Sequence, residues 1–154
     1  MALPRPLALP TALRALPQPL FVFDGVCVLC SRTVRFTLQR ERDTALRFAP
    51  AQSDIGQAVF KALGLPNDFY ETLVVLADDR AYVKSAAVLR LAQRLRQPWR
   101  GLGAVASLLP RALLDWLYDR MARSRYKMFG RYDACMVPEP ALASRFVVGT
   151  SQPR

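Results

Sequence analysis

The chain has 154 residues, of which 22 are basic and 12 acidic, with three cysteines and no histidine. This length fits one ordinary domain that can fold without disulfide bonds. An odd number of cysteines argues against a secreted disulfide framework, so we expect reduced thiols and a cytoplasmic location. The formal charge of +10 attracts anions without naming any, and because nearly all the bases are arginine it also fits a bias in genome composition.

Residues 1–19 carry five prolines and no acidic residue. Their apolar runs are shorter than the roughly 7–15 residues of a signal-peptide core. The prolines also oppose the amphipathic helix of a transit peptide. We therefore interpret this segment as a flexible or extended N-terminal extension.

A strand, a turn and a helix are predicted next. The apolar run at residues 20–23 is typical of a short strand buried on both faces. Asp24 and Gly25 end that strand, and residues 31–42 favour a helix because they contain neither glycine nor proline. Cys27 and Cys30 lie between the two elements with CxxC spacing. The first cysteine is thus expected at a strand-to-helix junction.

This position favours thiolate chemistry at Cys27. A helix N-terminus can lower the pKa of a thiol from about 8.5 to roughly 3.5–7.5. We expect Cys27 to be the exposed thiol with the lowered pKa, and Cys30, one turn later, to close a disulfide with it. The alternatives are half of a zinc site or two buried thiols without chemistry. A closed zinc site needs four ligands and only Cys135 adds a thiol, so we expect no metal and no organic cofactor.

The same residues resemble a known family. Asp24, Cys27 and Cys30 match the DxxCxxC motif of the thioredoxin-like DCC-type thiol-disulfide oxidoreductases. The resemblance covers about residues 20–147, and its further matches are residues 84–89, Trp99, residues 108–110 and residues 125–131.

The resemblance implies a role for each residue of the motif. Cys27 would be the nucleophile and Cys30 the resolving thiol. Asp24 would orient a group or accept a proton, with a local turn or cap role as the alternative. The substrate would be a protein or small-molecule thiol or disulfide, and the reductant is not specified.

Residues 45–49 alternate between apolar and polar, which predicts a half-buried strand that Pro50 ends. Ser53 and Asp54 are candidate N-caps of a short helix that ends near Leu63. A hairpin of residues 73–77 and 81–84 follows.

Ser85 is placed to cap the next helix. The apolar face expected for that helix is Val88, Leu91 and Leu95, and the solvent-facing positions are Arg90, Arg94 and Arg96.

This order predicts a thioredoxin-like core at residues 20–97, with a mixed four-stranded sheet flanked by helices. The first two strands should be parallel and the last two antiparallel. Most thioredoxin-like folds have a cis-proline just before the third strand. Here that position reads Tyr70-Glu71-Thr72, and the nearest proline is Pro66.

Residues 98–147 predict an added helical region packed on the core. Pro110 should begin a helix that runs to about Met128 and ends at Gly130, with a buried stripe of Leu113, Leu114, Leu117, Tyr118 and Met121. The apolar run between Arg100 and Arg111 is about half of the ~20 residues that a spanning helix needs, so no transmembrane segment is expected. Packing across the sheet or against the CxxC rim is favoured, with a surface-bound helix as the alternative.

Basic residues around the end of that helix do not share one face, so we do not expect nucleic-acid binding; they are Arg120, Arg123, Arg125, Lys127 and Arg131. A non-catalytic basic module that binds anionic partners is the alternative function.

Cys135 is interpreted as a half-buried packing thiol, with exchange against a Cys27–Cys30 disulfide as the alternative. Residues 148–154 should form a loose tail, and the apolar patch at residues 146–148 is assigned to the same loose end.

Overall fold

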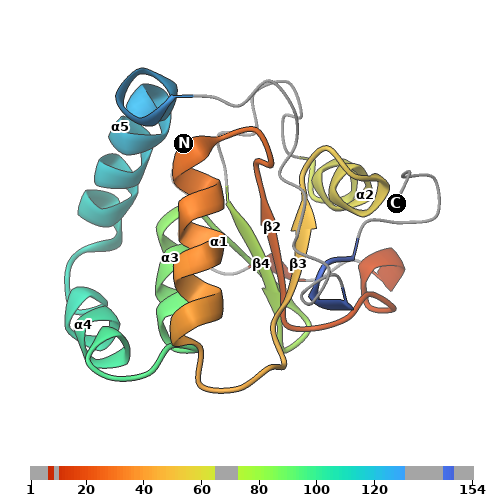
Figure 1. The fold of residues 1–154 in the computed structure, drawn as a ribbon, viewed down its shortest axis with the longest axis horizontal. Coiled ribbons are helices and arrows are strands. Elements are labelled where there is room, and N and C mark those ends of the chain that lie inside the picture. Colours follow the sequence, from red (N-terminus) through yellow and green to blue (C-terminus); the bar gives the residue numbers. More distant parts are fainter. Residues whose placement is uncertain (1–6, 9–10, 65–72, 131–143, 148–154) are drawn as a thin grey trace.

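The computed structural model describes residues 7–8, 11–64, 73–130 and 144–147 (Figure 1). Its strands are β1 (Leu7–Ala8), β2 (Leu20–Phe23), β3 (Arg47–Pro50), β4 (Val74–Ala77) and β5 (Arg80–Val83). Its helices are the short 3-10 helix η1 (Thr11–Leu13), α1 (Val28–Arg40), α2 (Asp54–Ala62), α3 (Lys84–Ala92), α4 (Trp99–Ala106) and α5 (Arg111–Phe129).

The strands form one mixed sheet in the order β1-β5-β4-β2-β3. β2 and β3 are parallel, as the crossover through α1 requires, and β4 is antiparallel to both β2 and β5. The predicted thioredoxin-like sheet is therefore confirmed, with β1 added at the edge beside β5.

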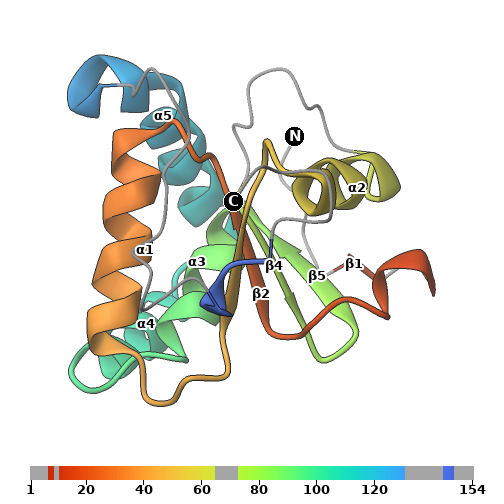
Figure 2. The ribbon, with the colours of Figure 1, turned by 45° about the vertical axis from the view of Figure 1, so that its right-hand side comes forward.

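The alternation of side chains along β2 divides the core into two layers. Leu20 and Val22 face η1 and α2, whereas Phe21 and Phe23 face α1 and α3. Figure 2 shows α1 and α3 on one side of the sheet and α2 on the other. All four residues are at most 1 % exposed, so the predicted strand buried on both faces is confirmed.

Helices α4 and α5 form a further layer outside α3 rather than covering the sheet (Figure 1). Gly103 of α4 makes this approach possible, because a Cβ atom there would lie 2.7 Å from the Cβ atom of Ala92 on α3. None of the residues of α4 is fully buried. The added region thus leaves much of its own surface exposed.

Three predicted boundaries need correction. Helix α1 begins at Val28 rather than residue 31, because Cys27 already serves as its N-cap. The strand predicted at residues 45–49 runs from Arg47 to Pro50, so Pro50 is its last residue, in an edge strand that tolerates a missing N–H group. Ser85 does not cap α3, whose N-cap is Val83 without a side-chain bond. The Ser85 hydroxyl instead donates a hydrogen bond to the Asp115 carboxylate of α5.

That bond bears on the predicted stripe of α5, which is correct in part: Leu114 and Tyr118 are half-buried, but the other three residues are exposed. Leu113, Leu117 and Met121 are 42–48 % exposed, while Asp115 is 2 % exposed. The polar start of α3 draws the acidic side of α5 inward and turns its apolar side outward. On α3 itself Val88 is exposed, and Ala87 takes the expected inward position.

Both end segments are more ordered than the sequence predicts. β1 pairs with β5, and Leu13 of η1 is buried against the α2 side of the core. Phe146 is buried beside β3 and forms a parallel bridge with Phe48. Residues 144–147 are therefore attached to the sheet edge rather than loose.

A bidentate ion pair anchors that segment. The Arg145 guanidinium donates to both Glu41 carboxylate oxygens at 2.7 Å and to the Leu46 carbonyl at 2.8 and 3.0 Å. The Arg145 and Glu41 side chains are only 11 % and 9 % exposed. This pair therefore ties the end of α1 to the start of β3.

No helix in the described ranges combines the length and apolar character needed to cross a membrane. Cys135, residues 70–72 and the tail at 148–154 lie outside the described residues, so their predictions stay predictions.

We expect Glu41→Ala to lower the free energy of unfolding by about 3 kcal/mol, because it leaves the largely buried charge of Arg145 without its partner. Urea unfolding followed by circular dichroism measures this. The control is Asp43→Ala, which removes an exposed ion pair with Arg94 at 3.8 Å and should cost less than about 1 kcal/mol. Equal losses in the two variants would contradict the anchoring role.

Candidate functional site

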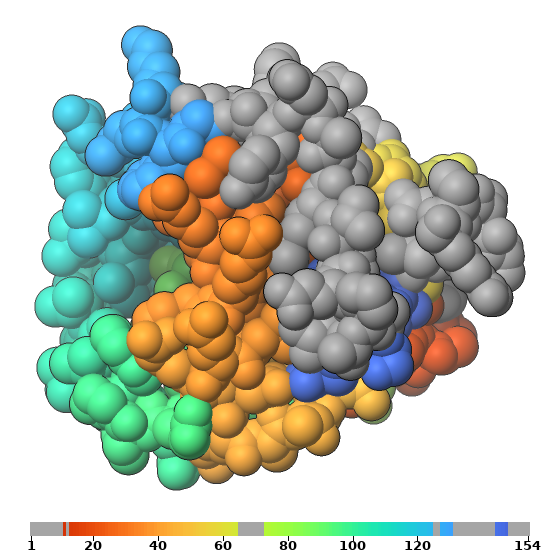
Figure 3. Space-filling model, in the orientation of Figure 1, coloured from red at the N-terminus to blue at the C-terminus, as the bar shows by residue number. Residues whose placement is uncertain are grey.

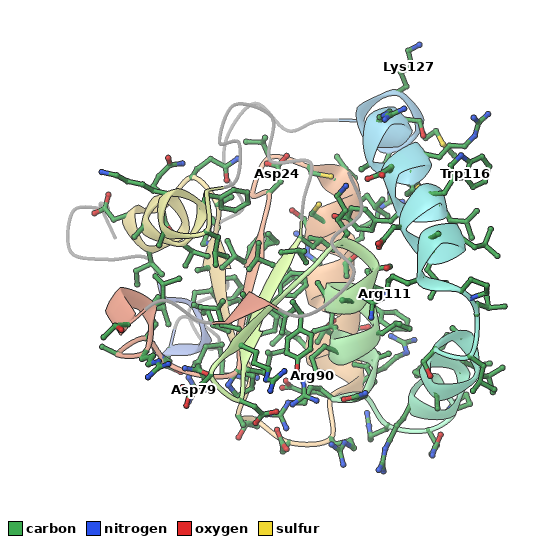
Figure 4. All side chains as sticks on the ribbon, turned by 180° about the vertical axis from the view of Figure 1, so that it is seen from behind. Asp24, Asp79, Arg90, Arg111, Trp116 and Lys127 are labelled. Carbon is green, nitrogen blue, oxygen red and sulfur yellow. The ribbon has the colours of Figure 1, made fainter. Side chains whose placement is uncertain are left out.

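The CxxC segment begins where β2 ends, at the N-terminal end of α1. Figure 4 labels Asp24 at this end of the sheet. The Asp24 carboxylate accepts the Val26 N–H at 3.1 Å and its carbonyl accepts the Cys27 N–H at 3.2 Å. These bonds form a tight turn of the kind that aspartate favours. The turn places Cys27 at the N-cap of α1, where the Cys27 backbone is extended.

At the N-cap, the Cys27 sulfur stands where serine or aspartate usually caps a helix. Its Sγ atom accepts the Cys30 N–H at 3.3 Å, and its carbonyl accepts the Ser31 N–H at 3.0 Å. The sulfur therefore takes up one of the helix's unpaired N–H groups and lies at the positive end of the helix dipole. The predicted strand-to-helix position of Cys27 is confirmed. The Cys27 and Cys30 sulfurs are not joined in a disulfide.

The prediction that Cys27 is exposed is wrong. Cys27 has no exposed surface and Cys30 is 5 % exposed. Both belong to the apolar cluster that contains Phe23 and Ala87. Apolar surroundings disfavour a thiolate, whereas the donated N–H group and the helix N-terminus favour it. Sequence spacing identifies the cap position, but burial depends on side chains from α3 and the sheet.

Gln52 is a site residue that the sequence did not suggest. Its side-chain nitrogen donates to the Asp24 carboxylate at 2.7 Å, and its side-chain oxygen accepts the Gly25 N–H at 2.9 Å. Gln52 follows β3, which is parallel to β2, and the carboxyl ends of parallel strands meet at one edge of a sheet. That rule is the signal that could have found it. These bonds support the turn role of Asp24, and its proton-accepting role stays a prediction.

The end of α5 meets the CxxC segment. Gly130 has φ +89°, a left-handed conformation that suits glycine after a helix, and the predicted terminator is confirmed. Its carbonyl lies 3.5 Å from the backbone nitrogen of Val28, the residue after Cys27. The added helical region therefore contacts the CxxC rim at this point.

In the described part of the chain, no group of three or more histidine, cysteine, aspartate or glutamate side chains is arranged to hold a metal ion.

Comparisons with known proteins agree on one family. The model of the DCC1-like thiol-disulfide oxidoreductase family matches residues 21–131. "Uncharacterized protein YuxK" of Bacillus subtilis (strain 168) is 37 % identical over 132 residues, which cover 86 % of this chain and 96 % of that protein. "DCC family protein At1g52590, chloroplastic" of Arabidopsis thaliana is 36 % identical over 118 residues, covering 77 % and 69 % of the two chains. No solved structure gives a significant match.

We expect Gln52→Leu to lower the free energy of unfolding by about 1–2 kcal/mol, because the buried Asp24 carboxylate loses a hydrogen bond that a leucine of similar size cannot replace. Urea unfolding measures the change. Gln39→Leu, an exposed position on α1, is the matched control and should stay within about 0.5 kcal/mol of the parent chain. A Gln52 variant as stable as this control would remove Gln52 from the site.

Proposed function

The chain belongs to the DCC1-like thiol-disulfide oxidoreductase family, and from this membership we propose that Cys27 and Cys30 pass two electrons between thiols and disulfides. The observation that carries the proposal is the Cys27 sulfur, which caps α1 and accepts the Cys30 N–H. A thiolate at this atom would be stabilised by the helix N-terminus.

In the reducing direction, the Cys27 thiolate attacks one sulfur of a substrate disulfide. A mixed disulfide forms, and the other substrate sulfur leaves as a thiolate that takes up a proton. The Cys30 thiolate then attacks the Cys27 sulfur, the intramolecular disulfide forms, and the second substrate sulfur leaves and is protonated. The substrate gains two electrons and the CxxC pair loses two. Two external thiols restore the dithiol: the first opens the Cys27–Cys30 disulfide and forms a mixed disulfide with Cys27, and the second attacks that adduct, so that the reductant leaves as its own disulfide and Cys27 is released as a thiol.

The assignment of roles rests on position along α1. Cys27 is the N-cap, so the helix N-terminus acts directly on its sulfur, whereas Cys30 lies within the first turn. The backbone nitrogen of Cys30 is 3.3 Å from that sulfur, so the resolving residue is already beside the atom it must attack. We propose that Asp24 and Gln52 act by holding the turn that sets this geometry.

Burial of both sulfurs bears on how a substrate reaches them. With Cys27 fully buried, a substrate disulfide has to enter where the rim opens, so we propose that rim opening precedes exchange. We also propose a cytoplasmic, reducing location, which the odd cysteine count favours.

We predict that Cys30→Ser accumulates a mixed disulfide with oxidised glutathione, because Cys27 can attack but the adduct cannot be resolved. Intact-protein mass spectrometry measures the adduct, and Cys135→Ser in the same background excludes a contribution from the third thiol. Cys27→Ser should trap at least about 10-fold less. Equal trapping by the two variants would overturn the roles, and no adduct in either would favour the basic interaction module.

We further predict that reagent size governs the alkylation of Cys27 in the native Cys135→Ser protein. For each reagent, the rate with the native protein is divided by the rate with the protein unfolded in urea. This ratio should be at least about 10-fold higher for iodoacetamide than for a polyethylene-glycol maleimide of about 5 kDa, because the native rim admits only small groups. Gel shift and mass spectrometry follow the two reactions. Equal normalised rates would show that the rim does not limit access.

A further inference from the structure

The outer surface of α4 and α5 is apolar over a large area. We define the α4–α5 face by Leu102, Val105, Leu108, Leu109, Leu113, Trp116, Leu117 and Met121, which are 42–84 % exposed. Figure 3 shows the two helices along one margin of the molecule, beside α1. Single exposed apolar residues are ordinary, but eight large ones between residues 102 and 121 indicate an interaction surface.

Helix geometry places these side chains on the outward side. Leu113, Trp116 and Leu117 recur three and four positions apart, on the side of α5 opposite the buried Asp115. Figure 4 shows Trp116 pointing away from the sheet. On α4, Gly103 faces α3, so Val105, two positions along, lies on the far side of the helix.

The charges of these helices are distributed just as unevenly. Residues 99–129 contain six basic and two acidic residues. Both acids are engaged with α3, since Asp115 accepts the Ser85 hydroxyl and Asp119 forms a 2.9 Å ion pair with Lys84. Arg111 has a buried guanidinium nitrogen and Arg100 lines a hollow beside Leu89 of α3, so the positive charge of the outward side comes from Arg120, Arg123 and Lys127.

The basic residues gather at the C-terminal half of α5. Arg120, Arg123 and Lys127 line a hollow of about 600 Å³ together with Trp116 and Met128. The Arg120 guanidinium lies 5.8 Å from the centre of the Trp116 ring. Cationic groups are thus placed directly beside exposed aromatic and aliphatic surface.

We propose that the α4–α5 face binds the surface of a bilayer that contains anionic lipids. The helices would lie in the plane of the interface, with the apolar side chains inserted and the basic groups on the lipid phosphates. Charge complementarity selects this occupant. A second copy would offer the same face, whose acids Asp115 and Asp119 are bonded to α3, and so no negative charge to pair with the basic residues of α5.

This inference is independent of the redox proposal, because no residue of the α4–α5 face belongs to the CxxC segment. It has a consequence for the site, however. The end of α5 contacts Val28, so docking through α5 would hold the CxxC rim within about one helix diameter of the lipid headgroups, roughly 10–12 Å.

Flotation with vesicles of phosphatidylcholine alone, and with 30 % phosphatidylglycerol added, tests the proposal. We expect binding to the anionic vesicles at least about 10-fold tighter than to the neutral ones, weakening as salt rises. Arg120→Gln, Arg123→Gln and Lys127→Gln combined should weaken it about 100-fold. Arg14→Gln, Lys61→Gln and Arg80→Gln remove the same charge from exposed positions on other elements and should have less than about a threefold effect.

Insertion has its own readout, because the chain has two tryptophans, Trp99 and Trp116. Anionic vesicles should shift the fluorescence of Trp99→Phe to shorter wavelength and leave Trp116→Phe unshifted. Leu113→Gln with Leu117→Gln should reduce binding at least about 10-fold, and since both side chains are exposed, unchanged thermal unfolding will show that the variant folds.

Three outcomes would overturn the proposal. The first is equal binding to neutral vesicles or none to either kind. The second is a dimer of the free protein, seen by light scattering, that the two leucine substitutions dissociate. The third is binding to soluble polyglutamate that is as tight as vesicle binding and is unaffected by those leucine substitutions. That result would indicate that the face binds acidic proteins.

Discussion

The hydrogen bond from the Cys30 backbone N–H to the Cys27 sulfur is the contact around which the CxxC segment is built. Three segments that lie far apart in the sequence hold the backbone around this bond. Asp24 sets the turn after β2, Gln52 holds that turn from the end of β3, and Gly130 at the end of α5 approaches Val28. A sulfur used as a helix cap completes the helix, and the N–H group that it accepts can also stabilise negative charge on the sulfur. Burial of the same atom opposes that charge, so the two effects on Cys27 act in opposite directions.

The added helix α5 departs from the usual arrangement of an amphipathic helix. Its inward side carries Asp115 and Asp119, which bond to side chains at the start of α3, beside the half-buried Leu114 and Tyr118, and its outward side carries leucine, tryptophan and methionine. A buried carboxylate is tolerated only with partners, so the start of α3 determines which side of α5 turns inward. Once that side is fixed, the apolar stripe has to face outward. The exposed face is thus a direct result of polar packing inside the added region.

The sequence predicts local features of this fold well. The strand at residues 20–23, the Ser53 cap of α2 and the stop at Gly130 follow from short patterns that the surroundings do not override. The thioredoxin-like order and the capping position of Cys27 follow from the same patterns. The sequence fails where a remote partner decides the outcome. Ser85 has the residue type of a cap but bonds to α5 instead, and the stripe of Leu113 and Leu117 has helical spacing but no core to face. The burial of Cys27 and the contribution of Gln52 depend on packing between segments, which spacing along the chain does not encode.

The Arg145–Glu41 ion pair also shapes the order in which the fold can assemble. It joins residues 104 positions apart, so forming it closes a loop of about two-thirds of the chain. The entropy lost in closing a loop grows with its length, and contacts between distant residues are favourable only after the intervening chain has become compact. The hairpin of β4 and β5 and the crossover from β2 to β3 need far shorter loops. We therefore expect the edge of β3 to be covered late in folding, and an uncovered strand edge is one through which two incompletely folded chains can associate.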